Sequence, residues 1–192
     1  MGIEKARGAD VTAAEVIRGT GSDAVAVAKG AFLVECFDKD GKLKWSVENH
    51  NLVVNVGLQY MAGVALTSTA QLTSWYVGLY GAGGSNNPAA TDTMSSHAGW
   101  TEAVPYSNAT RPAATFAAAT NANPSVVTNS ASKATFNINA TATVGGAFLT
   151  SDNTKSGSTG TLFSAADFQA PGDRSVVNGD TLTVTYTFSL SA

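Results

Sequence analysis

Histidine, cysteine and clustered acidic or hydroxyl residues are the usual carriers of catalysis, and this chain has few of them. His50 and His97 belong to neither a His-Glu-x-x-His zinc motif nor a Gly-x-Ser-x-Gly nucleophile motif. Asp92, Ser95 and His97 are close in sequence, but a catalytic triad is defined by three-dimensional geometry, and hydroxyl-rich turns produce such clusters without one. We favour helix capping by Asp92 or Thr91 and expect no enzymatic activity.

Two turn-like segments superficially resemble ligand-binding loops. Asp38–Gly41 begins like a calcium loop, but Lys42 and Asn49 stand where an EF-hand needs an oxygen ligand and a glutamate. Gly81–Gly84 is glycine-rich but lacks the Lys-Ser or Lys-Thr pair of a phosphate-binding loop. The single Cys36 also leaves no cysteine-rich metal site. We therefore predict no metal ion and no cofactor.

Aromatic side chains offer another kind of site, because their rings combine apolar faces with polar edges that suit sugars. The alternative is that they fill a β-sandwich core. We favour the core, because their neighbours lack the dense Asp, Asn and Arg groups that would orient sugar hydroxyls. The residues in question are Trp75, Tyr76, Tyr80, Trp100 and Tyr106.

Charge and hydropathy exclude two classes of partner. The net charge is −3 and charged residues make up only 13% of the chain, so no basic field competes for phosphates, and we predict no nucleic-acid binding. The most apolar stretch, Leu52–Leu66, is interrupted by polar residues and glycines and is too short to span a bilayer. We predict no membrane segment. The charge-broken N-terminus predicts no secretory signal.

The elements that would position these residues begin with a hairpin pattern. Phe32–Phe37 and Leu43–Val47 flank the turn-forming Asp38–Gly41, and the second run alternates apolar and polar residues. The apolar period then becomes helical, which predicts a helix at Asn55–Ala65. The run Ser74–Tyr80 is typical of a strand and precedes a loop rich in glycine and asparagine.

The second half alternates strand-like runs with turn clusters. The runs are Thr115–Ala119, Lys133–Ala142, Gly146–Leu149, Thr161–Ala165 and Thr181–Leu190. Strict alternation of apolar and polar residues predicts one buried and one wet face in two of them. Their apolar positions are Phe136, Ile138, Leu182, Val184, Tyr186, Phe188 and Leu190.

Many short strands, one helix and no repeated βαβ unit predict a mainly β protein: an antiparallel β-sandwich or jelly roll with one short helix. We assign this domain to residues 31–192. Its predicted core includes Trp45, Trp75, Tyr186 and Phe188.

Residues 1–30 differ in character and are predicted to form an extended N-terminal arm. Residues 1–50 hold 7 basic and 8 acidic side chains, against 4 and 6 in the rest of the chain. A helix at Thr12–Arg18 would be marginal alone, and glycines break the segment; a merely disordered terminus is the alternative. The predicted partner-binding anchors of the arm are Val11, Val16, Ile17, Val25 and Val27.

Several ordered blocks of sequence extend the interpretation. They are Glu48–Leu58, Trp75–Leu79, Ala90–Glu102, Gly145–Leu149, Thr159–Phe163 and Val177–Leu182. Together they cover about residues 45 to 190 and resemble a family of small virion structural proteins of tailed bacteriophages. The arm lies outside this pattern.

The resemblance implies a non-enzymatic place on the phage particle. The leading expectation is a capsid decoration or cement protein that stabilises the head by bridging capsid subunits. Its partners would be the major capsid protein and copies of itself, as a homo-oligomer on the outer head surface of the virion, after synthesis in the host cytoplasm. The rival expectation is a tail-fibre or receptor-binding module, in which aromatic residues of the Gly81–Trp100 loop would contact a host glycan.

Overall fold

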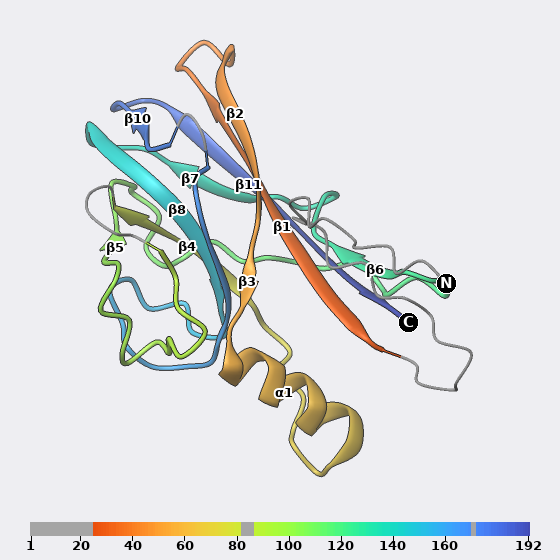
Figure 1. The fold of residues 1–192 in the computed structure, drawn as a ribbon. Helices are drawn as coiled ribbons and strands as arrows, with labels where there is room; N and C mark the ends of the chain where they lie inside the picture. The colour runs from red at the N-terminus through yellow and green to blue at the C-terminus, as the bar shows by residue number, and fades with distance from the viewer. Residues whose placement is uncertain (1–24, 82–86, 170–171) are drawn as a thin grey trace, which may run out of the picture.

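The computed structural model describes residues 25–81, 87–169 and 172–192. The described strands form two antiparallel sheets that pack face to face as a β-sandwich, with one helix at one end (Figure 1). Sheet A has the order β2-β1-β11-β6, with β7 also paired to β11; sheet B has the order β3-β9-β8-β4-β5, with β10 paired to β8. The mainly β fold predicted from the sequence is confirmed.

The bounds of the strands follow in chain order. Sheet A contains β1 (Val27–Phe37), β2 (Leu43–His50), β6 (Ser125–Thr128), β7 (Ala134–Asn137) and β11 (Thr181–Ser191). Sheet B contains β3 (Leu52–Val53), β4 (Tyr76–Gly81), β5 (Glu102–Ala103), β8 (Ala142–Thr150), β9 (Leu162–Asp167) and β10 (Arg174–Val176).

The predicted hairpin is confirmed as β1 and β2, whose register places Val34 opposite Val47. Its turn is built by Asp38, whose carboxylate accepts the backbone N–H groups of Asp40 and Lys42, each at 2.9 Å. Gly41 has a φ of 78°, a conformation that glycine adopts without steric cost. The Asp38–Gly41 segment therefore makes a hairpin turn.

The predicted helix is confirmed as α1 (Asn55–Leu66), and the strand expected at Ser74–Tyr80 is β4. Two predictions about later runs were wrong. Thr115–Ala119 is not a strand, and the Lys133–Ala142 run is split between β7 and β8. The split occurs because Ile138 leaves the β11 ladder. Its N–H donates instead to the carbonyl of Asp180, in the turn that precedes β11, at 2.9 Å.

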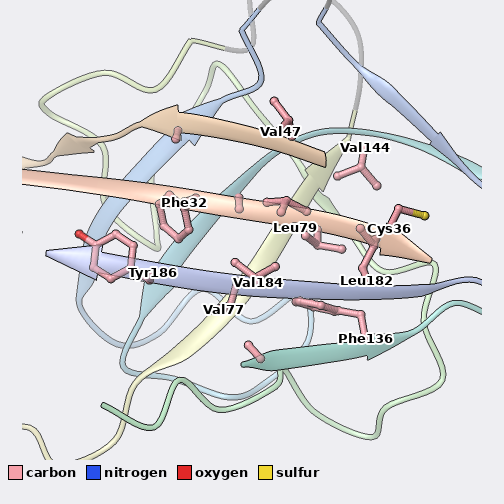
Figure 2. Close-up of a cluster of buried hydrophobic side chains, with 14 of the residues drawn as sticks. Phe32, Cys36, Val47, Val77, Leu79, Phe136, Val144, Leu182, Val184 and Tyr186 are labelled. Carbon is pink, nitrogen blue, oxygen red and sulfur yellow. The ribbon is translucent and has the colours of Figure 1, made fainter. Parts of the chain in front are cut away.

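The main core fills the space between the two sheets. Phe32, Phe136 and Val184 from sheet A meet Val77 and Leu79 from sheet B, all with 1% or less of their surface exposed (Figure 2). The apolar side of the alternating pattern therefore faces the opposite sheet, as hydrophobic burial requires.

The prediction that the other face of β11 is uniformly wet was wrong. Thr185 is only 8% exposed, whereas Leu190, expected on the buried face, is 42% exposed. β11 is the central strand of sheet A, and Asn129 bonds to its backbone on both sides of Thr185, accepting from the N–H of Tyr186 and donating to the carbonyl of Val184. Thr185 thus lies in the middle of the sheet beside the buried Asn129, while Leu190 lies near the end of the strand.

A second core lies on the other face of sheet B. Tyr80, Phe148 and Trp100 are nearly fully buried there, and Met94 and Leu162 join them. The segment from residue 87 to 101 covers this face, so the middle strands of sheet B are buried on both sides.

Only the end of the predicted arm is described. β1 begins at Val27, which pairs with Ser191, so residues 27–30 belong to sheet A. Val25 is 48% exposed and Val27 is half-buried. The other predicted anchors, Val11, Val16 and Ile17, lie outside the described residues.

Candidate functional site

Asp92, Ser95 and His97 are not assembled as a triad. Asp92 accepts the backbone N–H of Ala89 and the indole N–H of Trp100, both at 2.9 Å. The His97 Nδ1 lies 2.8 Å from the Trp100 carbonyl oxygen, its ring stacks on that indole at 3.9 Å, and Ser95 bonds to neither residue. The group fixes Trp100 over sheet B, and Asp92 caps a turn rather than a helix.

Metal-binding side chains do not gather in the part of the chain that the structure describes, where no group of three or more His, Cys, Asp or Glu residues could hold an ion. Cys36 is buried in the core beside Asp180. Burial, with the negative charge of Asp180, raises the pKa of the Cys36 thiol to about 12. The thiol is therefore protonated and unreactive at neutral pH.

Asp180 ties the turn before β11 to the β1–β2 hairpin. Its carboxylate accepts from the Lys44 ammonium at 2.5 Å and from the Val177 N–H at 2.9 Å. Burial acts to raise the pKa of Asp180, but these hydrogen bonds and the charge of Lys44 outweigh it, so the pKa is lowered. The pair therefore has a structural role: it joins β2, through Lys44, to the turn at Val177–Asp180.

The largest buried polar feature is the Arg111–Glu102 pair. Arg111 donates from Nε and Nη2 to the two Glu102 oxygens at 2.9 and 2.7 Å, and its side chain is 0% exposed. Its remaining N–H groups donate to the carbonyls of Asp152 and Gly157 at 2.8 and 3.0 Å, and its guanidinium lies 5.3 Å from the Phe148 ring centre.

The same network holds residues 151–160 against the sandwich. Glu102 also accepts the Ser156 N–H at 2.7 Å. Lys155 donates to the carbonyls of Tyr106 and Asn108 at 2.9 Å each and lies 4.3 Å above the Tyr106 ring. Sequence reasoning missed this cluster, although the scarcity of basic residues after position 50 singles out Arg111 and Lys155. The Arg111 guanidinium and the Glu102 carboxylate are thus bonded to protein groups, which indicates a structural lock on residues 151–160.

The aromatic residues divide into two groups. Tyr80, Trp100 and Tyr106 are 0%, 4% and 1% exposed, so they are core residues and present no ring to a sugar. Trp75 and Tyr76 are half-buried. The Trp75 ring packs edge-on between Tyr60 and Phe163, at centroid distances of 5.5 and 5.4 Å.

Trp75 and Tyr76 line a groove beside a segment that crosses from one sheet to the other. We call residues 112–120 the crossover segment. It is held to sheet B by the Ala114 N–H, which donates to the Trp75 carbonyl at 2.8 Å, and to sheet A by the Ala117 N–H, which donates to the Thr128 carbonyl at 3.0 Å. Between these ends a groove of about 630 Å³ opens, lined by residues 71–76, residues 113–119 and Val127. We call it the crossover groove.

Another surface feature is the outer side of α1. Leu58 and Leu66 are 44% and 86% exposed, and Ala62 and Ala65 lie exposed between them. The spacing of these four residues places them on one side of the helix, and we call them the α1 face. α1 carries no charged residue, and only Gly57 of the helix is fully buried.

No helix within the described residues is long and apolar enough to cross a bilayer. The chain was also compared with known protein families, curated proteins and solved structures, and none of the three comparisons found a match.

Proposed function

We propose that this chain is a non-enzymatic structural protein of a tailed-phage virion, a decoration or cement protein that bridges capsid subunits. The sequence blocks that resemble small virion proteins support the proposal. They form the end of β2, the start of α1, parts of β4, β8 and β9 in sheet B, the start of β11 and the segment that covers sheet B, so they describe the sandwich itself.

The observation that carries the proposal is the exposed α1 face. The apolar side chains of a helix are normally buried, because they would otherwise order water at a free-energy cost. Here the whole stretch from Asn49 to Thr91 has no Asp, Glu, Lys or Arg, and α1 projects from one end of the sandwich (Figure 1). Such a helix is suited to an apolar contact with another protein.

We assign the capsid surface as the partner of the α1 face, and the N-terminal arm as the second attachment, with Val11, Val16 and Ile17 as its anchors. Two attachments allow one copy to bridge two capsid subunits. A protein that binds only the assembled shell stabilises it by mass action, and repetition over the head makes modest single contacts collectively strong.

Replacing the exposed leucines tests the capsid contact. Leu58→Glu and Leu66→Glu are each expected to lower the affinity for capsids stripped of this protein by about tenfold or more, because a buried leucine contributes about 1.5–3 kcal/mol. Thermal unfolding should change little, since both side chains are exposed in the isolated chain. Ala140→Glu is the matched control, because it adds the same charge at an exposed position outside α1.

Cosedimentation of each variant with stripped capsids measures this affinity. Rebinding of both leucine variants at the level of the Ala140→Glu control would contradict the assignment of α1. A parallel melting curve shows that each variant is folded.

The rival function is a receptor-binding module of the tail, and the observation that favours it is the half-buried Trp75 and Tyr76 pair in the crossover groove. Its weakness is that Trp100, the aromatic ring expected in the Gly81–Trp100 loop, is 4% exposed. Copy number separates the two functions, because a decoration protein covers the head whereas an adhesin is confined to the tail.

A further inference from the structure

The crossover segment presents an unpaired backbone edge. Ala117 and Thr120 donate their N–H groups to β6 and Ala114 donates to Trp75, just before β4, but the N–H groups of the other residues from 115 to 119 donate to no described residue. Across the crossover groove, the N–H groups of Thr73 and Ser74 are also without a described acceptor. The groove therefore has backbone hydrogen-bonding groups on both walls.

This edge lacks the features that protect edges in other β proteins. Exposed edge strands are normally blocked by a lysine, another charge or a bulge, since an open edge is a template for pairing with a second chain. Residues 112–132 contain no Asp, Glu, Lys or Arg. Ala117, Ala118 and Ala119 are all exposed, so the edge carries only small side chains at these positions and no charge.

We propose that the crossover groove is a contact surface between two copies of this chain, in which residues 115–119 of each copy pair antiparallel across a twofold axis. The inference goes beyond the proposed function, because a decoration protein can attach to a capsid as a monomer.

Two features favour a second copy over another occupant. A twofold axis makes two identical segments run antiparallel, which is the arrangement that forms a regular ladder between edges. The edge also carries no charge, so two copies meet without like-charge repulsion, and it offers no charged group for recognition of a charged partner. The exposed alanines leave room for the backbones to approach.

Placing a charge on the edge is the direct test. Ala118→Lys brings two ammonium groups together at the proposed twofold contact and is expected to weaken self-association at least tenfold, as measured by sedimentation equilibrium. Ala140→Lys is the matched control: Ala140 is an exposed alanine that lies outside the crossover segment and the groove lining. A wild-type protein that is monomeric throughout, or equal association of both variants, would overturn the proposal.

Cross-linking locates the contact independently of affinity. Ala118→Cys is expected to give a covalent dimer with a short bismaleimide, and Ala140→Cys is expected to give none. The native Cys36 is buried and has a pKa of about 12, so it should not react and wild type is the blank. A dimer that forms equally from the Ala140→Cys variant would place the contact elsewhere.

This outcome is separable from the proposed function. The Leu58→Glu variant should lose capsid binding but still self-associate, whereas Ala118→Lys should lose self-association and keep its α1 face. Loss of both properties in both variants would mean that the two surfaces are not distinct.

Discussion

Tyr186→Asp is expected to leave the chain unfolded at 25 °C. The Tyr186 side chain is 1% exposed, and its ring lies 4.6 Å from that of Phe32. Its hydroxyl accepts hydrogen bonds from Asn51 and Ser164 at 2.9 and 3.1 Å. A carboxylate there would lack an opposite charge and would leave both donors unpaired. That costs several kcal/mol, comparable with the whole stability of about 5–15 kcal/mol of a small protein.

Circular dichroism and urea unfolding measure this effect. Asn139→Asp is the control, because it adds the same charge at an exposed position beside the buried Ile138 and should change stability by no more than about 0.5 kcal/mol. Phe188→Asp should have a smaller effect than Tyr186→Asp, since Phe188 is half-buried. Equal urea midpoints for Tyr186→Asp and Asn139→Asp would show that this face of β11 is not the core face.

Arg111→Met is expected to destabilise the protein by about 3–5 kcal/mol, which corresponds to a fall in melting temperature of roughly 6 to 20 °C. The variant leaves the Glu102 carboxylate nearly buried, at 7% side-chain exposure, without its cation. It also removes the donors that hold the carbonyls of Asp152 and Gly157. Residues 151–160, the loop between β8 and β9, should then become more accessible to proteolysis than the strands of sheet B.

The double variant Arg111→Met/Glu102→Leu separates the two causes. Removing the unpaired charge should recover a large part of the lost stability, because apolar replacement of a complete buried ion pair is often close to neutral. Differential scanning calorimetry of both variants measures the recovery. A single variant that melts with the wild type would contradict the assignment of Arg111 as the lock of this loop.

Local patterns predicted the elements whose stabilising contacts are close in sequence. The β1–β2 hairpin follows from alternation around a turn-forming Asp38–Gly41, and α1 follows from a run of apolar residues with helical spacing. Thr115–Ala119 has strand-like composition as well, but the chain there crosses between two sheets, and among the described residues only the Ala117 N–H of this run bonds to a strand. Composition does not encode that crossing.

The site features were less predictable because they depend on long-range contacts. Leu58 is apolar, yet it is 44% exposed, because α1 rests on the sandwich through its other side. There Gly57 is buried, and Val56, Tyr60 and Met61 pack against the two cores. The Arg111 lock depends on carbonyls more than 40 positions away. The Asp92 and His97 cluster is local in sequence, but its role in holding Trp100 needed the fold.

The proposed decoration role predicts where the chain lies in the phage particle. A cryo-electron microscopy reconstruction of the phage that carries this chain should show the sandwich on the outer surface of the head, repeated in hundreds of copies, with α1 facing the capsid. Density for the chain on the tail in tens of copies or fewer, or its absence from the purified particle, would contradict the proposal.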